Sequence, residues 1–174
     1  LSCCTDYLFL DEAFDGLERY TCNTYNSFGD LLEQQVYIDD CNMVATELTW
    51  HPEYSLETSR TSWQGLNKTD NKVLKLSVYG NADGTENENG HYLVAEKVLL
   101  DDGGSEDPNN FVWAVTHYKY HANGLVKEIT DPEGHVTLIE YDNNGYRTFV
   151  RRGVDPNSTE VVERYLYDAI GQLV

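Results

Sequence analysis

The residues best suited to bind a metal ion lie in an acidic stretch in the middle of the chain. Residues 85–90, followed by Glu96, place oxygen-bearing side chains at the spacing of an EF-hand calcium loop. The first ligand of such a loop should be an aspartate, and here it is Thr85, while the flanking residues are typical of strands rather than helices. Asn87, Asn89 and Glu96 are therefore only a weak calcium candidate, and a solvated hairpin loop is the favoured interpretation.

Other residue types that support catalysis do not form a recognisable constellation. His117 and His121 have the spacing of a helical metal pair, but on a strand their side chains would be about 13 Å apart. No GxSxG motif, HExxH motif or phosphate-binding glycine loop is present. Carboxylates are so frequent that two near each other do not indicate a glycosidase pair. The sequence predicts no enzyme and no cofactor.

Three tryptophans could stack on sugar rings. Trp50, Trp63 and Trp113 are far apart in the chain, and a shared face would be needed to make a platform. Tryptophan in a β-rich chain more often packs in the core or between repeats. Packing is the favoured interpretation, and a glycan-binding platform is the alternative.

Four cysteines lie in the first quarter of the chain: Cys3, Cys4, Cys22 and Cys41. None forms a CxxC pair, which argues against a structural zinc site. In an oxidising compartment they could form two disulfides by any of three pairings, and four reduced thiols are the alternative. The sequons at Asn67 and Asn157 would matter only in a glycosylated, secreted protein.

The overall composition is that of a folded, acidic protein. The chain has 174 residues, 40% of them hydrophobic and 12% aromatic, with a net charge of −18. This charge disfavours nucleic acid as a partner, and no apolar run approaches the roughly 18 residues that a membrane span requires. The chain lacks an initiator methionine and a signal peptide, and we expect it to be an excerpt from a larger polypeptide.

Four-residue turns that end in glycine divide the chain into strands. Such turns are expected at residues 26–29, 121–124, 131–134, 142–145 and 168–171. Gly suits the fourth position of each, and Asp or Asn suits the first position of all except the turn that begins with His121. The segments between the later turns are rich in Val, Ile, Thr, Tyr and Phe, which favour strands. Strands are expected at residues 111–120, 125–130, 135–141, 146–152 and 160–167.

Tyrosine and glycine recur together along the second half of the chain. Tyr120 to Tyr141 and Gly124 to Gly145 are both 21 residues, and the next interval to Tyr167 and to Gly171 is 26 residues in both cases. A shared spacing of this kind indicates an internal repeat.

Repeats are harder to identify in the rest of the chain. Further strands are expected at 43–54, 72–79 and 91–100, the last between two acidic loops, and a helix is only weakly suggested near residues 10–17. We expect residues 1–40 to be a degenerate copy that contains Cys3, Cys4 and Cys22, residues 41–110 to hold strands with acidic insertions, and residues 111–174 to hold the clear repeats.

The repeats resemble those of the Rhs or YD-repeat family, whose pattern is roughly Asp-Pro-x-Gly, a Thr, then Tyr-Asp-x-x-Gly-Arg-Leu. The match is specific over residues 115–174 and loose over 18–35, with His121 where the pattern has Asp, Tyr146-Arg147 in place of Arg-Leu, and Gln172 in place of Arg. The matching residues are Tyr120, Gly124, Asp131, Pro132, Gly134, Thr137, Tyr141, Asp142, Gly145, Tyr167, Asp168, Gly171 and Leu173.

The resemblance implies an all-β fold, in which antiparallel two-stranded repeats stack edge to edge into a spiralling sheet that closes as a shell or tube. We expect each motif tyrosine to lie on the adjacent repeat, and the motif aspartates to accept hydrogen bonds from turn amides.

Three functions are compatible with this fold. The first is a structural segment of a secreted or surface-exposed YD-repeat protein, forming the wall of a shell, tube or filament. Its partners would be other repeats of the same polypeptide or identical copies, without nucleic acid or membrane insertion. The second is an adhesion module that binds a glycan or a partner, with or without calcium. The third is the container wall of a toxin-delivery protein.

Overall fold

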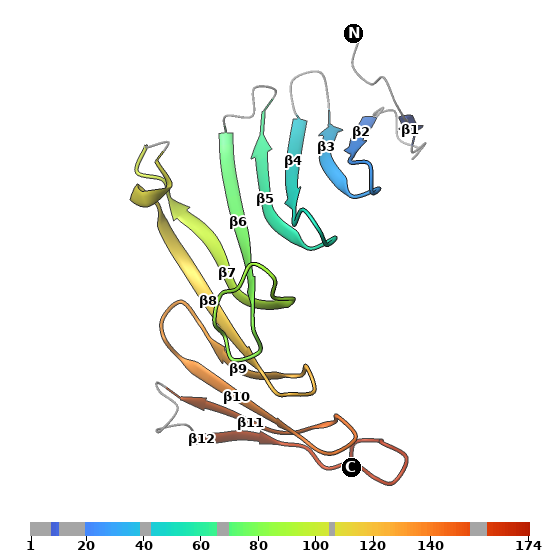
Figure 1. The fold of residues 1–174 in the computed structure, drawn as a ribbon, viewed down its shortest axis with the longest axis vertical. Coiled ribbons are helices and arrows are strands. Elements are labelled where there is room, and N and C mark those ends of the chain that lie inside the picture. The colour runs from blue at the N-terminus through green and yellow to red at the C-terminus, as the bar shows by residue number, and fades with distance from the viewer. Residues whose placement is uncertain (1–7, 11–19, 39–42, 66–69, 105–106, 154–159) are drawn as a thin grey trace. The chain divides into compact units, whose positions relative to one another are not determined.

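The computed structural model describes residues 8–10, 20–38, 43–65, 70–104, 107–153 and 160–174. These residues form twelve β-strands and one short 3-10 helix, η1 (Pro108–Asn110), and the described ranges contain no α-helix (Figure 1). The strands are β1 (Leu8–Leu10), β2 (Tyr20–Tyr25), β3 (Leu31–Tyr37), β4 (Met43–Trp50), β5 (Glu57–Gln64), β6 (Asp70–Gly80), β7 (Tyr92–Asp101), β8 (Val112–Tyr120), β9 (Val126–Thr130), β10 (Val136–Tyr141), β11 (Arg147–Gly153) and β12 (Glu160–Arg164).

The strands form one open sheet whose strand order is the order of the sequence. The predicted all-β fold of antiparallel strands is therefore confirmed. The chain divides into two compact units, unit 1 (Leu1–Leu76) and unit 2 (Ser77–Val174), with the boundary inside β6. The two units are defined by contacts within the folded chain. The three parts expected from the sequence were defined instead by how clearly the repeat motif could be recognised in each.

Most strands of unit 2 lie within one or two residues of their expected positions. The turns mark where each strand ends, so β8 to β11 match the prediction closely. The last strand, expected to reach Tyr167, ends at Arg164, and Tyr167 instead forms an isolated bridge with Leu173. The weak helix suggestion near residues 10–17 falls almost entirely outside the described residues.

The strand β5 was missed because its sequence, ETSRTSWQ, has no apolar alternation. It forms because it pairs on both sides, with β4 and with β6. Its hydroxyl groups also bond across the strands, as in the 3.0 Å contact between Thr46 Oγ1 and Ser62 Oγ. Pairing with neighbouring strands therefore stabilises β5, although its sequence has no hydrophobic pattern that would predict a strand.

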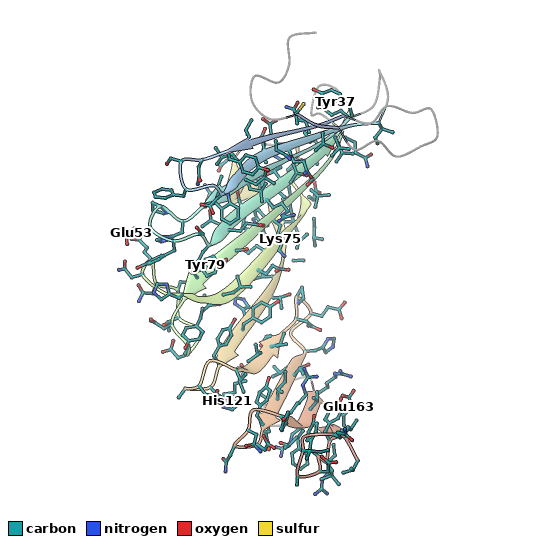
Figure 2. The ribbon with its side chains drawn as sticks, turned by 90° about the vertical axis from the view of Figure 1, so that its right-hand side faces the viewer. Tyr37, Glu53, Lys75, Tyr79, His121 and Glu163 are labelled. Atoms are coloured by element: carbon teal, nitrogen blue, oxygen red, sulfur yellow. The ribbon has the colours of Figure 1, made fainter. Side chains whose placement is uncertain are left out.

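Side chains project from both faces of the strands (Figure 2), and within each unit both faces carry buried side chains. In β7, Val94 and Ala95 are consecutive and each is 1% exposed, although successive side chains point to opposite faces. No polar or charged residue among those described is buried. The buried hydrophobic residues are Met43, Ala45 and Leu48 in unit 1, and Val94, Ala95, Val136, Ile139 and Val150 in unit 2.

Two glycines allow the connection between β6 and β7 to fold back on the end of β6. Gly80 forms a bridge with Glu86, and an added Cβ at Gly80 would collide with the carbonyl of Thr85. An added Cβ at Gly90 would collide with the backbone of Gly80. The two main chains therefore approach closely only because neither residue has a side chain.

We predict that Gly90→Ala lowers the free energy of unfolding by about 2–3 kcal/mol, because backbone must move to admit the methyl group. Gly29→Ala is the matched control. Its φ is +90° but its Cβ would meet nothing within 4 Å, so only the backbone cost of about 1–2 kcal/mol is expected. Urea unfolding of the full chain measures both, and equal losses would contradict the close approach.

Candidate functional site

Among the described residues, six four-residue turns share one pattern of backbone hydrogen bonds. In each, the final glycine donates its N–H to the carbonyl of the first residue at 2.9–3.1 Å. The first residue donates its own N–H to the carbonyl of the residue after the glycine, at 2.8–3.0 Å. The glycine φ lies between +83° and +91°, which other residues rarely adopt. These glycine turns are residues 26–29, 81–84, 121–124, 131–134, 142–145 and 168–171.

Five of the six turns were predicted, and the turn at residues 81–84 was missed among the acidic residues around it. In four of them an Asn or Asp side chain at the first position holds the turn closed. Its Oδ1 atom accepts the N–H groups two and four residues later, as expected for the motif aspartates. The distances are 2.9 and 2.9 Å at Asn26, 2.9 and 2.8 Å at Asp131, 2.9 and 2.9 Å at Asp142, and 3.0 and 2.8 Å at Asp168.

In the other two turns, the backbone N–H of the residue after the glycine bonds to the side chain of the third residue instead of the first. In the turn that begins at His121, Asn123 Oδ1 accepts the N–H of Leu125 at 3.2 Å. In the turn at residues 81–84, Asp83 Oδ1 accepts the N–H of Thr85 at 2.9 Å. The absence of Asp at position 121 is therefore compensated within the turn.

The motif tyrosines of unit 2 each contact a ring in, or directly after, the preceding connection at the same end of the strands, as expected. Tyr120 lies on Tyr92 with ring centroids 4.8 Å apart, and Tyr167 lies on Tyr146 at 4.9 Å. Tyr141 meets the ring of His121 edge-on at 5.8 Å. Offset and edge-on pairs at these separations are favourable geometries for aromatic rings.

Polar bonds add to two of these ring contacts. The hydroxyl of Tyr120 donates to the carbonyl of Leu93 at 2.7 Å, and Nε2 of His121 lies 3.1 Å from the carbonyl oxygen of Ile139. The hairpins of unit 2 are therefore tied to their predecessors by rings and by hydrogen bonds.

Three turn glycines of unit 2 lie against a side chain that ends or directly follows the preceding connection at the same end of the strands. A Cβ on Gly124 would be 3.9 Å from Tyr92, and one on Gly145 would be 3.7 Å from Leu125. A Cβ on Gly171 would collide with the ring of Tyr146. Glycine is thus required at position 171 by packing as well as by its φ.

The Asp131-Pro132-Glu133-Gly134 turn lies at the opposite ends of the strands, between β9 and β10. Asp131 Oδ2 is 3.0 Å from Nδ1 of His135. The backbone N–H of His135, joined by its ring and by the N–H of Glu133, lowers the pKa of the Asp131 carboxyl. Thr137 is half-buried opposite Ile129.

The calcium candidate is a loop held by its own hydrogen bonds. Asn87 Oδ1 accepts the N–H of Asn89 at 3.0 Å, and Asn87 Nδ2 donates to Asn81 Oδ1 at 3.0 Å. Glu96 lies within β7, opposite Thr116 on β8. The described residues contain no group of three or more His, Cys, Asp or Glu side chains placed to hold a metal ion.

The remaining candidates are packing residues or lie outside the described chain. Trp50 Nε1 donates to the carbonyl of Leu31 at 2.7 Å, and Trp113 packs on Phe111 at 5.8 Å. Trp63 lies opposite Ala45, toward the other end of the β4–β5 pair from Trp50, so these two do not form a platform in unit 1.

Cys22 is disulfide-bonded. The other cysteines, Cys3, Cys4 and Cys41, and the sequon residues Asn67 and Asn157 lie outside the described residues.

We predict that Gly171→Ala destabilises the protein more than Gly134→Ala. Both glycines have a positive φ, which costs a methyl-bearing residue about 1–2 kcal/mol. Gly134 has open space around it, whereas at position 171 the methyl must displace Tyr146, adding about 1 kcal/mol or more. Chemical denaturation measures the difference. The extra loss should vanish when Tyr146→Ala is already present, and its persistence there would rule out ring displacement as the cause.

We predict that the Asp131 carboxylate stabilises the protein in a pH-dependent way. Its pKa is lowered in the folded state, so its contribution is fully present above about pH 5 and is lost as the pH falls below about 4. Asp131→Asn should therefore be less stable than wild type near neutral pH, and the difference should shrink on acidification. Urea unfolding at a series of pH values tests this, and a difference that stays constant down to about pH 2 would contradict it.

Comparison with known proteins shows a likeness of fold. No protein-family model and no curated protein matches the chain. Among the described residues, no helix is long and apolar enough to cross a membrane. The crystal structure of TcdB2-TccC3-Cdc42 contains a similar chain, with a TM-score of 0.58 and 14% identity over 91% of this chain. This chain spans 8% of the length of that chain, and the likeness at this identity shows a shared fold.

Proposed function

We propose that the chain is a structural segment of a large secreted or surface-exposed YD-repeat protein, and that its hairpins form part of the β-sheet wall of a shell, tube or filament. The observation that carries this proposal is the stacking in unit 2, where Tyr120, Tyr141 and Tyr167 each contact a ring of the preceding connection. With such contacts, each further hairpin can pack on the one before it in the same way, so the sheet can be extended by repeating one unit.

The distribution of buried residues supports a wall rather than a compact domain. Only eight hydrophobic residues among those described are buried, and they lie on both faces of the strands. A single hairpin is marginally stable in water, so each must gain stability from its neighbours in the sheet. A segment of this kind supplies surface and rigidity, and the proposal assigns it no catalysis.

Exposed apolar side chains gather around the last described turn. Leu166, Ile170, Leu173 and Val174 are 54–77% exposed, around the bridge between Tyr167 and Leu173. Exposed apolar side chains beside an open sheet edge favour association with a further strand. The partner in this proposal is another repeat of the same polypeptide or an identical copy.

Two comparisons point in the same direction. The repeat motif resembles the YD family over residues 115–174, and the fold resembles a section of a much longer chain, of which it covers 8%.

The disulfide at Cys22 supports an oxidising location outside the cytosol. A net charge of −18 would keep an exposed wall soluble and limit unwanted pairing of edges.

Electron microscopy of the intact native protein tests this proposal. We expect a continuous wall of strands, spaced by about 4.8 Å, in which this segment runs without a break into further β-sheet beyond β12. A closed hollow particle and a regular tube or filament would both support the wall. A compact separate domain, joined to the rest by linkers and with a free edge at β12, would overturn it.

A further inference from the structure

One tyrosine pair of unit 2 links two of the glycine turns. Tyr146 follows the turn at residues 142–145, and Tyr167 precedes the turn at residues 168–171. Their rings are stacked, with centroids 4.9 Å apart and planes inclined by 25°. The ring of Tyr146 is held on a second side by the turn itself, because a Cβ at Gly171 would collide with it. The pair is therefore pre-positioned by the fold.

The pair has one exposed member, and its phenol groups are not used in hydrogen bonds to the described residues. Tyr146 is 40% exposed, and Tyr167 is half-buried. Within the described part of the chain, neither phenol oxygen has a hydrogen-bond partner. A diffusible reagent can reach Tyr146 without any opening of the sheet.

The second tyrosine pair of unit 2 provides an internal comparison. Tyr92 and Tyr120 are equally close, at 4.8 Å, but their planes are tilted by 42°. The hydroxyl of Tyr120 donates to the carbonyl of Leu93 at 2.7 Å. Burial, together with neighbouring tyrosines, raises the pKa of Tyr120, so this phenol holds its proton more firmly. The two tyrosine pairs therefore have nearly the same distance between ring centroids, but they differ in solvent exposure and in the hydrogen bonding of their phenol groups.

We propose that Tyr146 and Tyr167 form an intramolecular dityrosine cross-link when the protein meets a diffusible one-electron oxidant, and that the Tyr92–Tyr120 pair does not. The cross-link is a modification site that fastens the final turn to the β10–β11 hairpin. The Tyr146 ring lies directly on its partner, so coupling is favoured over encounter with another molecule.

The reaction balances as a two-electron oxidation. Each phenol loses one electron to the oxidant and its hydroxyl proton to water, which gives two tyrosyl radicals. The radicals join through one carbon–carbon bond between the ring carbons next to the hydroxyl-bearing carbons. The hydrogen on each joined carbon then moves to the oxygen, which restores both aromatic rings and both hydroxyl groups. The protein loses two hydrogen atoms in all.

The test uses the full chain, dilute, with light-activated tris-bipyridine ruthenium and persulfate as the oxidant. Dityrosine fluorescence reports the product, and mass spectrometry of the digested monomer identifies the joined peptides. We expect a peptide containing Tyr146 joined to one containing Tyr167. Tyr146→Phe and Tyr167→Phe should each abolish it, and Tyr120→Phe, the matched control, should retain it. Circular dichroism checks that each variant keeps its β-sheet.

Unfolding provides a control that needs no variant. In guanidinium chloride the two rings are no longer held together, and the 146–167 cross-link should be lost from the wild-type chain. The proposal is overturned if the folded wild type gives no such cross-link or gives only cross-links between molecules. A yield at Tyr92–Tyr120 that equals the yield at Tyr146–Tyr167, or an equal yield in denaturant, overturns it as well.

Discussion

Each hairpin in the second half of the chain depends on the hairpin before it, because the sheet is a single layer with few buried side chains. A motif ring that lies on the preceding connection supplies apolar contact that no second layer provides. The turn glycine is part of the same contact, since a side chain at Gly171 would push Tyr146 away. Stacking of one connection on the next is therefore the constraint that fixes both the spacing of the repeat and the choice of residues at its turns.

The glycine turns can be closed by a side chain at more than one position of the turn. Four glycine turns are closed by Asn or Asp at the first position, and two by the third residue, Asn123 or Asp83. The hydrogen bonds satisfied are those of the turn backbone in both cases, so a sequence can depart from the repeat motif without losing the turn. The turn is kept through the repeat by its final glycine, its backbone hydrogen bonds and its ring contacts, whereas the residue at its first position varies.

Much of the second half could be predicted from the sequence because glycine turns and tyrosine spacing mark both ends of each strand. The strand β5 could not, since its polar residues form a strand only through pairing with β4 and β6. Spacing alone also suggested calcium at Asn87 and Asn89, but it does not show that the Asn87 side chain already bonds to its own loop. Which ring each tyrosine contacts depends on strand register and turn length, which become visible only in three dimensions.

Hydrogen exchange on a chain truncated after Leu166 tests the dependence of each hairpin on its neighbours most directly. Truncation there removes Tyr167 and the turn at residues 168–171, and it keeps β10, β11 and the hydrogen bond from the N–H of Tyr165 to the carbonyl of Thr148. Loss of a ring pair worth about 0.5–1.5 kcal/mol predicts roughly two- to twelvefold faster exchange of the amides in the turn at residues 142–145, with β4 and β5 unchanged. Unaltered exchange in that turn would show that the hairpin is stable by itself, and would contradict the account.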